Sequence, residues 1–385
     1  MAERSFKAEV EHLKLGAGET FTGEGILAIT KALLESGVGY VGGYQGAPIS
    51  HLMDVLADAE ELLADLGVRF EANANEAAAA AMLAASVHYP IRGAVTFKGP
   101  VGVNVASDAL ANLSSSGVTG GALVIVGEDY GEGSSIMQER SHPFAMKAQM
   151  WLLDPRPNLP SIVKMVSDGF DLSEASNTPV MLMVRIRSCH VTGSFTTRDN
   201  QRPKLTVREA VANPRSDFAR VVLPPMSYAH EQDKVKNRWP AAEKFIQERG
   251  LNEFFGPKDA RFGIVVQGGM YNGLIRALQR LGLADIYGNT DVPAVSPHIR
   301  PVFNGPLVLN SDYTAAEAAA DVASGRCDAV SFGRPYISNP DLEKRIAVGA
   351  HWNPNKDVPK SWYFPIPEGY VDYPTLAEEQ AEAAE

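Results

Sequence analysis

Glu76 and Lys98 are the side chains whose type and position best suit chemistry in the first half of the sequence. Glu76 opens an alanine-rich helical pattern directly after a predicted strand, and Lys98 lies in the Gly-rich stretch FKGPVGVN (97–104). Two further Gly-rich stretches, GGYQGAPIS (42–50) and GEDYGEGSS (127–135), also follow predicted strands. Ligands of open α/β sheets bind in the loops beyond the carboxyl ends of the strands. The sequence therefore predicts a ligand site formed by these loops.

Each candidate residue of these loops also has a purely structural interpretation. Glu76 would be favourable at a helix N-terminus through the helix dipole alone. Lys98 either faces an anionic group or is a solvated loop lysine. Gly46 and Pro48 are typical turn residues, although a glycine also allows a ligand to approach the backbone closely. Gly99, next to Lys98, is included with them as a candidate ligand contact.

The elements that would position these residues alternate between helix and strand. Short, continuous apolar runs such as GALVIVGED are typical of strands in a sheet that is covered on both faces, and apolar residues at helical spacing indicate the helices. Strands are predicted over 68–73, 92–99, 121–129 and 178–186, and residues 38–48 are predicted to be a short strand that runs into a Gly/Pro turn. Helices are predicted over 22–37, 50–67, 75–90, 103–116 and 161–175. This order predicts a doubly wound α/β domain with a parallel sheet over residues 1–195.

Three segments follow this domain. Residues 196–257 are polar and contain several prolines, so we expect a linker with some helix. Residues 258–293 show a strand, a Gly turn and a helix, and are expected to begin a second, smaller α/β unit. Their QGGMYNG stretch has neither the GxGxxG nor the Walker spacing of a phosphate loop. Residues 294–385 are expected to form a C-terminal βαβα fragment with an acidic tail.

The composition excludes several classes of protein. The formal net charge is -11, whereas a nucleic-acid surface would need a basic stripe. Apolar runs such as PVMLMV (179–184) are too short to cross a bilayer, and the charged N-terminal stretch lacks the apolar core of a signal peptide. We therefore expect a cytoplasmic protein that binds neither nucleic acid nor membranes.

The cysteine and histidine content argues against a metal centre within this chain. Its two cysteines, Cys189 and Cys327, cannot provide the four ligands of an iron–sulfur cluster. The eight histidines show no HExxH or similar spacing. We therefore predict no metal-ligating residues.

Four motifs in the first part of the chain resemble one enzyme family. GYQGAPIS, EANANEAAAAAMLAAS, TFKGPVGVNVASDAL and VIVGEDYGEGSSIMQER occur in the order found in the N-terminal pyrimidine-binding region of thiamine-diphosphate-dependent 2-oxoacid:ferredoxin oxidoreductases. The resemblance is greatest to the large subunit of indolepyruvate ferredoxin oxidoreductase, and it covers about residues 16–293.

This resemblance implies roles for the residues in the loops. Glu76 would hydrogen-bond the aminopyrimidine ring of thiamine diphosphate and promote the tautomer that removes the thiazolium proton. Gly46, Pro48, Lys98 and Gly99 would lie on the thiamine side of the same cofactor site.

The sequence departs from the family in one respect. The Gly-Asp-Gly…Asn stretch that binds diphosphate and Mg²⁺, and the cysteine-rich cluster motifs, are absent; the nearest stretch, SDGFDLSEASN (167–177), is predicted to be helical. The resemblance therefore implies one face of a shared site. A partner subunit or domain would hold the diphosphate, the Mg²⁺ and the iron–sulfur clusters that reduce ferredoxin, in a homo- or hetero-oligomer. We expect the chain alone to be inactive.

The end of the sequence resembles another family. FNGPLVLNSDY, ASGRCDAVSFGRPYISNPDLEKR and EGYVDYP are similar to the C-terminal end of old yellow enzymes, FMN-dependent ene-reductases, over about residues 296–374. This resemblance implies that Gly333 and Arg334 contact the FMN phosphate. The rest of the TIM barrel has no counterpart, and two strands cannot close a barrel. The alternative role for Arg334 is therefore a structural salt bridge.

Three functions remain open on these grounds. The motifs around Glu76 favour a subunit of a thiamine-diphosphate-dependent 2-oxoacid ferredoxin oxidoreductase. The tail alone favours an FMN-dependent NAD(P)H ene-reductase. A non-catalytic fusion or interaction module is the third, because each catalytic half lacks essential parts. The two resemblances meet near residues 291–300, where the prolines of DVPAVSPHIRP suit a linker.

Overall fold

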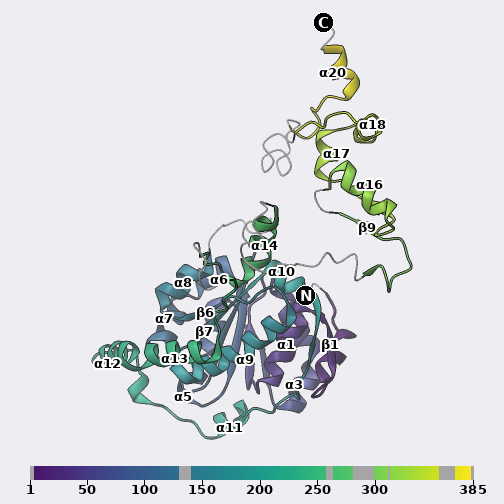
Figure 1. Cartoon of the computed structure of the whole chain (residues 1–385). Helices are drawn as coiled ribbons and strands as arrows, with labels where there is room; N and C mark the ends of the chain where they lie inside the picture. The colour runs from purple at the N-terminus through teal and green to yellow at the C-terminus, as the bar shows by residue number, and fades with distance from the viewer. Residues whose placement is uncertain are drawn as a thin grey trace. The chain divides into compact units, whose positions relative to one another are not determined.

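The protein is described here by a computed structural model that covers residues 4–129, 140–256, 263–280, 299–310, 313–354 and 369–382. The chain divides into two compact units, Met1–Thr290 and Asp291–Glu385, and Figure 1 labels the elements of both. Each unit is described by itself below.

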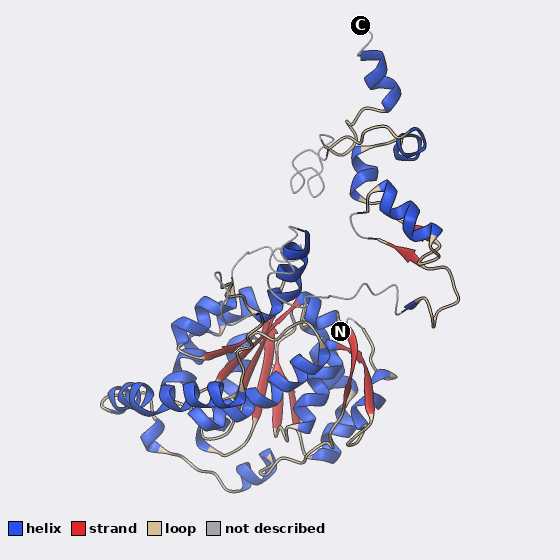
Figure 2. Cartoon of the chain, viewed as in Figure 1, coloured by secondary structure: helices blue, strands red, loops and turns tan. Residues whose placement is uncertain are grey.

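The first unit is built on a six-stranded parallel sheet, which confirms the predicted fold class. Its strands lie in the order β3 (Arg69–Ala72), β2 (Tyr40–Gly43), β4 (Gly93–Lys98), β5 (Ala122–Glu128), β7 (Val180–Arg185) and β6 (Trp151–Leu153). Helices cover both faces of this sheet (Figure 2). Every residue of β5 and β7 is buried, as a doubly covered parallel strand requires.

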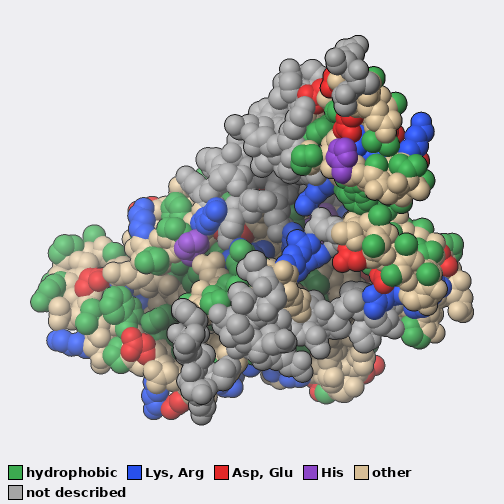
Figure 3. Space-filling model, turned by 45° about the horizontal axis from the view of Figure 1, so that its top comes forward, with side chains coloured by type: hydrophobic (Ala, Val, Ile, Leu, Met, Phe, Trp, Pro, Cys, Tyr) green, Lys and Arg blue, Asp and Glu red, His purple; other side chains and the backbone are tan. Residues whose placement is uncertain are grey.

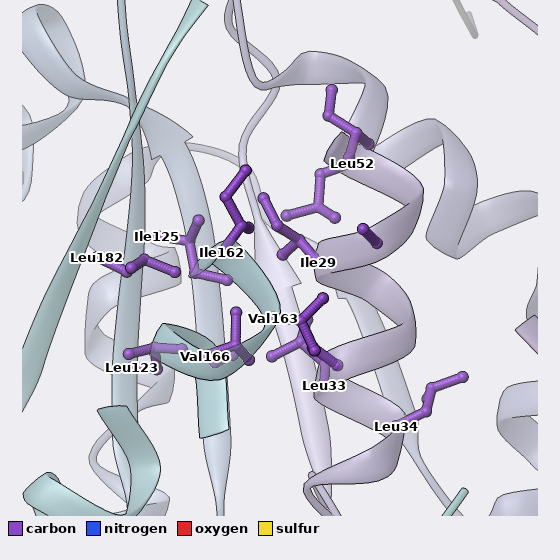
Figure 4. Packing of buried hydrophobic residues seen from close by; sticks show 14 of the residues in the cluster. Ile29, Leu33, Leu34, Leu52, Leu123, Ile125, Ile162, Val163, Val166 and Leu182 are labelled. Atoms are coloured by element: carbon purple, nitrogen blue, oxygen red, sulfur yellow. The ribbon is translucent and has the colours of Figure 1, made fainter. Parts of the chain in front are cut away.

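Alternate residues of the central strands enter two separate apolar cores, because side chains along a strand point to opposite faces. Leu123 and Ile125 pack in the core that contains α1 (Gly25–Glu35) and α9 (Leu159–Ser176), and Figure 4 shows this packing. Val124 and Val126 enter the second core, on the other face. The helices of that face are α4 (Glu76–Met82), α6 (Gly99–Val105), α7 (Ser107–Ser116) and α8 (Ser141–Ala148).

Several helices differ from the prediction in their bounds. The predicted helix 50–67 is divided at Ala59 into α2 (Ser50–Asp58) and α3 (Glu60–Leu66), and the predicted helix 75–90 is divided into α4 and α5 (Ala85–His88). The stretch SDGFDLSEASN lies in α9 and its C-cap, as predicted.

Two pairings were not predicted from the sequence. β1 (Thr20–Glu24) and β8 (Thr192–Thr196) form a separate antiparallel pair. β6 adds a sixth strand to the main sheet, at its edge beside β7. A short helix η1 (Glu9–Lys14) precedes β1, and α10 (Ile186–His190) links β7 to β8.

Residues 207–249 are largely helical and belong to the first unit. They form α11 (Val207–Ala212), η2 (Phe218–Arg220), α12 (Met226–Asp233), η3 (Lys234–Arg238) and α13 (Trp239–Arg249). Ala242 of α13 is part of the apolar core around α9. The buried Arg238 donates hydrogen bonds to the carbonyl groups of Ser114 and Ser115.

The sequence predicts a strand near residue 263, and this prediction is wrong for residues 263–267, the part that the structure describes. Residues 263–267 have no strand pairing, and they are followed by η4 (Gly268–Met270) and α14 (Tyr271–Arg280). The predicted helix is therefore present, whereas the strand before it has no neighbour among the described residues.

The second unit has the predicted strand–helix–strand–helix order. β9 (Val308–Leu309) pairs in parallel with β10 (Ala329–Val330) across α16 (Ala315–Ala323), and α17 (Arg334–Ser338) follows. α18 (Leu342–Val348) and α20 (Leu376–Glu382) come next. The fully buried Arg345 organises this end of the unit, because it binds Asp341, Glu379 and the carbonyl group of Pro374.

Lys, Arg, Asp and Glu side chains are interspersed on the face shown in Figure 3. Within the described ranges, no helix is long and apolar enough to cross a membrane.

Candidate functional site

The carboxyl ends of β2, β3 and β4 bring two of the predicted Gly-rich stretches together, 42–50 and 97–104; the third, 127–135, lies outside the described residues from residue 130 onward. The side-chain oxygen of Asn73, after β3, accepts a hydrogen bond from the backbone N–H of Gly43 at 2.9 Å. Gly46, after β2, lies against Lys98 at the end of β4, and a Cβ added at Gly46 would come within 2.7 Å of the Lys98 Cβ. The stretches 42–50 and 97–104 are therefore in direct contact, as a ligand site at this edge requires.

Glu76 is the first residue of α4 and lies at this edge of the sheet. The side chain of Asn75 caps the helix by accepting a hydrogen bond from the N–H of Ala78 at 2.9 Å. Glu76 is only 8% exposed, and its carboxylate makes no hydrogen bond or ion pair within the part of the chain that the structure describes. The Glu76 side chain is therefore largely buried at the ligand edge while its carboxylate has no protein partner there among the described residues, which favours a ligand contact over a helix-dipole role.

The small residues of α6 allow the Glu76 side chain to lie against that helix. A Cβ added at Gly102 would come within 3.0 Å of the Glu76 Cγ and within 2.6 Å of the Phe97 ring. Gly102 therefore keeps α6 close to both side chains. Because Phe97 belongs to the apolar core of this face, the carboxylate lies at the border between that core and the loops.

Of the two environments considered from the sequence, Lys98 has the first, because it faces an anionic group. Its Nζ lies 2.9 Å from the Asp129 carboxylate, which is fully buried at the end of β5. The ion pair joins the ends of two neighbouring strands and holds Lys98 at the ligand edge. The anionic group that Lys98 faces is therefore a side chain of this chain, and a contact of Lys98 with a ligand stays a prediction.

Glu128 is a buried residue of this edge that the sequence did not single out. Its Oε1 accepts a hydrogen bond from the N–H of Ser141, the first residue of α8, at 2.7 Å. A Cβ added at Gly99 would come within 2.5 Å of the Ser141 hydroxyl and 2.7 Å of Glu128 Oε1. Burial raises the pKa of the Glu128 carboxyl. The start of α6 is therefore packed tightly against the start of α8 through Glu128.

Arg185 and Asp154 are two further buried charges at the ends of β7 and β6. The Arg185 guanidinium lies 2.9 Å from Asp154 and donates a hydrogen bond to the side chain of Gln267 at 2.7 Å. Arg185 is the register partner of Glu128 in the sheet. A charged residue at the end of an apolar run indicates only that the strand ends there, so Glu128 and Arg185 could not be recognised as site residues from the sequence pattern.

The remaining candidates of the first unit lie at the same edge, and their ligand roles stay predictions. Pro48 is buried and follows Ala47 in a cis peptide bond. Gly46 is half-buried and Gly99 is buried. Together with Glu76 and Lys98, they line the ends of neighbouring strands. Within the described ranges, no group of three or more His, Cys, Asp and Glu side chains is arranged to hold a metal ion.

The tail candidates have a different setting. Gly333 and Arg334 begin the short helix α17 and are both exposed. A Cβ added at Gly333 would meet no atom within 4 Å. The structure therefore does not pack other groups around Gly333, and the FMN role of both residues stays a prediction.

Comparison with known proteins adds to this geometry. No family model matches the chain. Indolepyruvate oxidoreductase subunit IorA from Methanothermobacter thermautotrophicus is 30% identical over 257 residues, which are 66% of this chain and 40% of that protein. The same subunit from Methanothermobacter marburgensis is 30% identical over 280 residues, 70% of this chain and 42% of that protein.

The N-terminal part of the chain is similar to IorA. This finding supports the first resemblance drawn from the motifs around Glu76. The chain spans about two-fifths of the length of these curated relatives.

Short matches to ene-reductases also occur. A putative 12-oxophytodienoate reductase 4 from rice is 38% identical over 86 residues, 22% of each chain. The rice 12-oxophytodienoate reductase 7 is 41% identical over 81 residues, 21% of this chain and 20% of that protein. These matches cover only about a fifth of this chain, and they support the resemblance drawn for its tail.

A solved structure supports the fold. The 2-oxoglutarate:ferredoxin oxidoreductase from Magnetococcus marinus, with 2-oxoglutarate, coenzyme A and succinyl-CoA bound, matches with a TM-score of 0.51. The match covers 81% of this chain and 62% of that chain at 14% identity. At this identity the likeness concerns the fold alone.

Proposed function

We propose that the first unit supplies the aminopyrimidine-binding face of a thiamine diphosphate site in a 2-oxoacid oxidoreductase of the indolepyruvate type. The observation that carries the proposal is Glu76, a carboxylate that is 8% exposed and has no partner among the described residues. It lies where ligands bind in open α/β sheets. The similarity of the N-terminal part to IorA supports the choice of this substrate class.

The residues of this chain fit the pyrimidine half of the cofactor. Thiamine diphosphate, when bound, supplies the nucleophilic carbon that attacks a 2-oxo group. Glu76, in its protonated form, would donate a hydrogen bond to a ring nitrogen, and its carboxylate would accept from that nitrogen once the proton has moved there. The Phe97 side of the site would exclude water from this hydrogen bond, which strengthens it. The Lys98–Asp129 ion pair and the Glu128–Ser141 contact would fix the neighbouring loops.

A partner chain completes the proposed site. The sequence has no motif for diphosphate and Mg²⁺ and too few cysteines for a four-cysteine cluster. We therefore infer that the diphosphate, the Mg²⁺ and the electron carriers to ferredoxin belong to a partner subunit in a cytoplasmic oligomer. The chain alone would not oxidise a 2-oxoacid.

The test is the Glu76→Gln substitution in the full chain, purified with its partners through an affinity tag from its native cell. With indolepyruvate as substrate and a viologen dye as electron acceptor, we expect a loss of about 100-fold or more in kcat, the usual effect of removing an acid–base group. Glu71→Gln is the matched control, because Glu71 is an exposed carboxylate paired with Arg69 on the neighbouring strand β3. A Glu76→Gln complex as active as the Glu71→Gln complex would contradict the proposal.

FMN binding by the tail is the second candidate, favoured only by the short ene-reductase matches. Because Gly333 and Arg334 are exposed on a unit with a two-stranded sheet, we expect no retained flavin. The visible spectrum of the freshly purified protein, together with its intact mass, decides this. A flavin band near ~450 nm at the expected mass would establish FMN binding and move the function toward flavin chemistry.

A further inference from the structure

Gln45 and Asp54 form a polar pair beside the loop that follows β2. The Gln45 Nε2 donates a hydrogen bond to the Asp54 Oδ1 at 3.1 Å. Gln45 is an exposed residue of the stretch GYQGAPIS and lies two residues beyond the end of β2. Asp54 belongs to α2 and is only 3% exposed. The pair therefore joins an amide at the surface to a carboxylate inside the protein.

The negative charge of Asp54 is buried without a cationic hydrogen-bond donor in the part of the chain that the structure describes. Within that part, Gln45 is its hydrogen-bond donor, and the Asp54 Oδ2 has none. A buried carboxylate oxygen without a partner is costly for stability. The Asp54 carboxylate is therefore an unusual group to retain beneath a loop at the ligand edge, unless its effect on Gln45 is useful.

That effect is to fix which end of the Gln45 amide faces inward. A carboxylate only accepts hydrogen bonds, whereas an amide has a donor nitrogen and an acceptor oxygen. The nitrogen must therefore face Asp54, and no described residue donates a hydrogen bond to the Gln45 Oε1. A hydrogen bond to a buried carboxylate also polarises the amide, which makes the Oε1 a stronger acceptor. Gln45 thus offers an oriented acceptor to another molecule.

Gln45 and Glu76 lie at the same edge of the sheet. Their strands, β2 and β3, are neighbours, and Gly43 is the register partner of Ala72. Gln45 follows the first of these strands by two residues, and Glu76 follows the second by four. Ligands of open α/β sheets bind across such neighbouring loops. A molecule bound beside Glu76 therefore meets the loop that carries Gln45.

We propose that Gln45 determines substrate specificity by accepting a hydrogen bond from an N–H or O–H group on the ring of an aromatic 2-oxoacid. This inference rests on the proposed function and names the substrate group that the site selects. An indole ring carries an N–H donor and a 4-hydroxyphenyl ring an O–H donor, whereas a phenyl ring has neither. Because like charges repel, the Asp54 carboxylate disfavours the substrate carboxylate at this place, so we assign the ring to Gln45.

The test compares two substrates that differ by one hydroxyl group, 4-hydroxyphenylpyruvate and phenylpyruvate, on the complex purified through the tagged full chain. We expect the unaltered complex to favour the first by about tenfold in kcat/KM, the effect of one hydrogen bond. Gln45→Leu should abolish this preference by lowering kcat/KM for 4-hydroxyphenylpyruvate alone. Asp54→Asn should reduce the preference in part, because an amide at 54 can donate or accept and no longer fixes the orientation of Gln45.

Binding of unreactive analogues provides a readout that needs no turnover. The compounds 4-hydroxyphenyllactate and phenyllactate carry the same two rings but have no 2-oxo group, and isothermal titration calorimetry gives their Kd values. We expect their Kd values to differ by about tenfold in the unaltered complex and to become equal in Gln45→Leu. Gln247→Leu is the matched control, because Gln247 is an exposed glutamine of α13, and it should leave both preferences unchanged.

Two results would overturn the proposal. The first is a preference that is absent from the unaltered complex or unchanged in Gln45→Leu. The second is an equal loss for both substrates in Gln45→Leu, which would mean that Gln45 only holds its loop against α2.

The outcome is distinguishable from that of the Glu76 test. If Glu76→Gln is inactive while Gln45→Leu keeps the preference of the unaltered complex, this inference is wrong and the proposed function stands. An unaltered complex that oxidises none of the aromatic 2-oxoacids would contradict the proposed function itself, and this inference with it.

Discussion

The two units of this chain carry equally recognisable motifs, but they surround them very differently. In the first unit, a parallel sheet with an apolar core on each face brings Glu76, Lys98 and Glu128 to one edge. In the second unit, a two-stranded sheet leaves Gly333 and Arg334 exposed. A motif therefore predicts a site only where the fold also assembles the residues around it.

The cores of the two units differ in kind as well. The two apolar clusters described above contain only residues of the first unit. In the second unit, a fully buried arginine, Arg345, is bound by carboxylates and carbonyl groups. This difference predicts that substitutions in the sheet core lower the stability of the first unit and leave that of the second unit unchanged.

The largest effect should come from Phe170→Ala. Phe170 is fully buried in the core around α9, and removing such a ring lowers the free energy of unfolding by about 3–5 kcal/mol. Differential scanning calorimetry of the full chain should show a lower Tm for the first unit and an unchanged transition for the second. Phe254→Ala, at an exposed position, is the control. An equal shift of both transitions would mean that the units unfold as one.

A smaller effect should distinguish two glycines at the two motif positions. At Gly99 an added methyl group would lie 2.5 Å from the Ser141 hydroxyl and 2.7 Å from Glu128 Oε1, so Gly99→Ala should destabilise the first unit by about 1–3 kcal/mol. Gly333→Ala has open space around it and should cost less than about 1 kcal/mol, the scale of a helix N-cap. Urea denaturation measures both. Equal costs would remove the contrast between the two sites.

The smallest effect concerns pH, where the two units should respond with opposite sign. Burial raises the pKa of Glu128 in the first unit, so its contribution to stability is lost as pH rises from the ordinary carboxyl pKa through the raised value. In the second unit, hydrogen bonds from the Leu307 N–H and from Arg300 lower the pKa of Asp328, so its contribution is lost as pH falls through that lowered value.

Glu128→Gln and Asp328→Asn isolate these two contributions. Gln at 128 retains an oxygen that can accept the Ser141 N–H, and it should make the stability of the first unit less dependent on pH. Asn at 328 should remove the acid sensitivity that Asp328 gives the second unit. Tm measured against pH for each variant checks this. If the two substitutions changed the pH dependence of Tm in the same direction, the directions assigned to the Glu128 and Asp328 pKa shifts would be contradicted.

The main sheet was predictable because its strands are strongly marked. Continuous apolar runs indicated β5 and β7, and the Gly-rich stretch 127–135 indicated a loop after β5. β6 escaped prediction because three residues, Trp151–Leu153, are too few to show a pattern. The pairing of β1 with β8 joins residues about 170 positions apart, which no local pattern contains.

The candidate site was predictable in its place but not in its contacts. The motif order located Glu76 and the Gly-rich loops at one edge. The partners of Lys98 and the burial of Glu128 depend on neighbouring strands, so a pattern along one strand could not reveal them. The strand over 263–267 was predicted from its β-branched residues, but strand formation also needs a neighbouring sheet edge.

The most direct test of the central claim is amide hydrogen exchange on the complex purified through the tagged full chain, with and without thiamine diphosphate and Mg²⁺. The proposed site predicts slower exchange in α4 around Glu76 and in residues 98–104, and unchanged exchange in residues 331–338 of the second unit. Unchanged exchange in α4, or slowing confined to residues 331–338, would contradict the assignment of the cofactor site to the first unit.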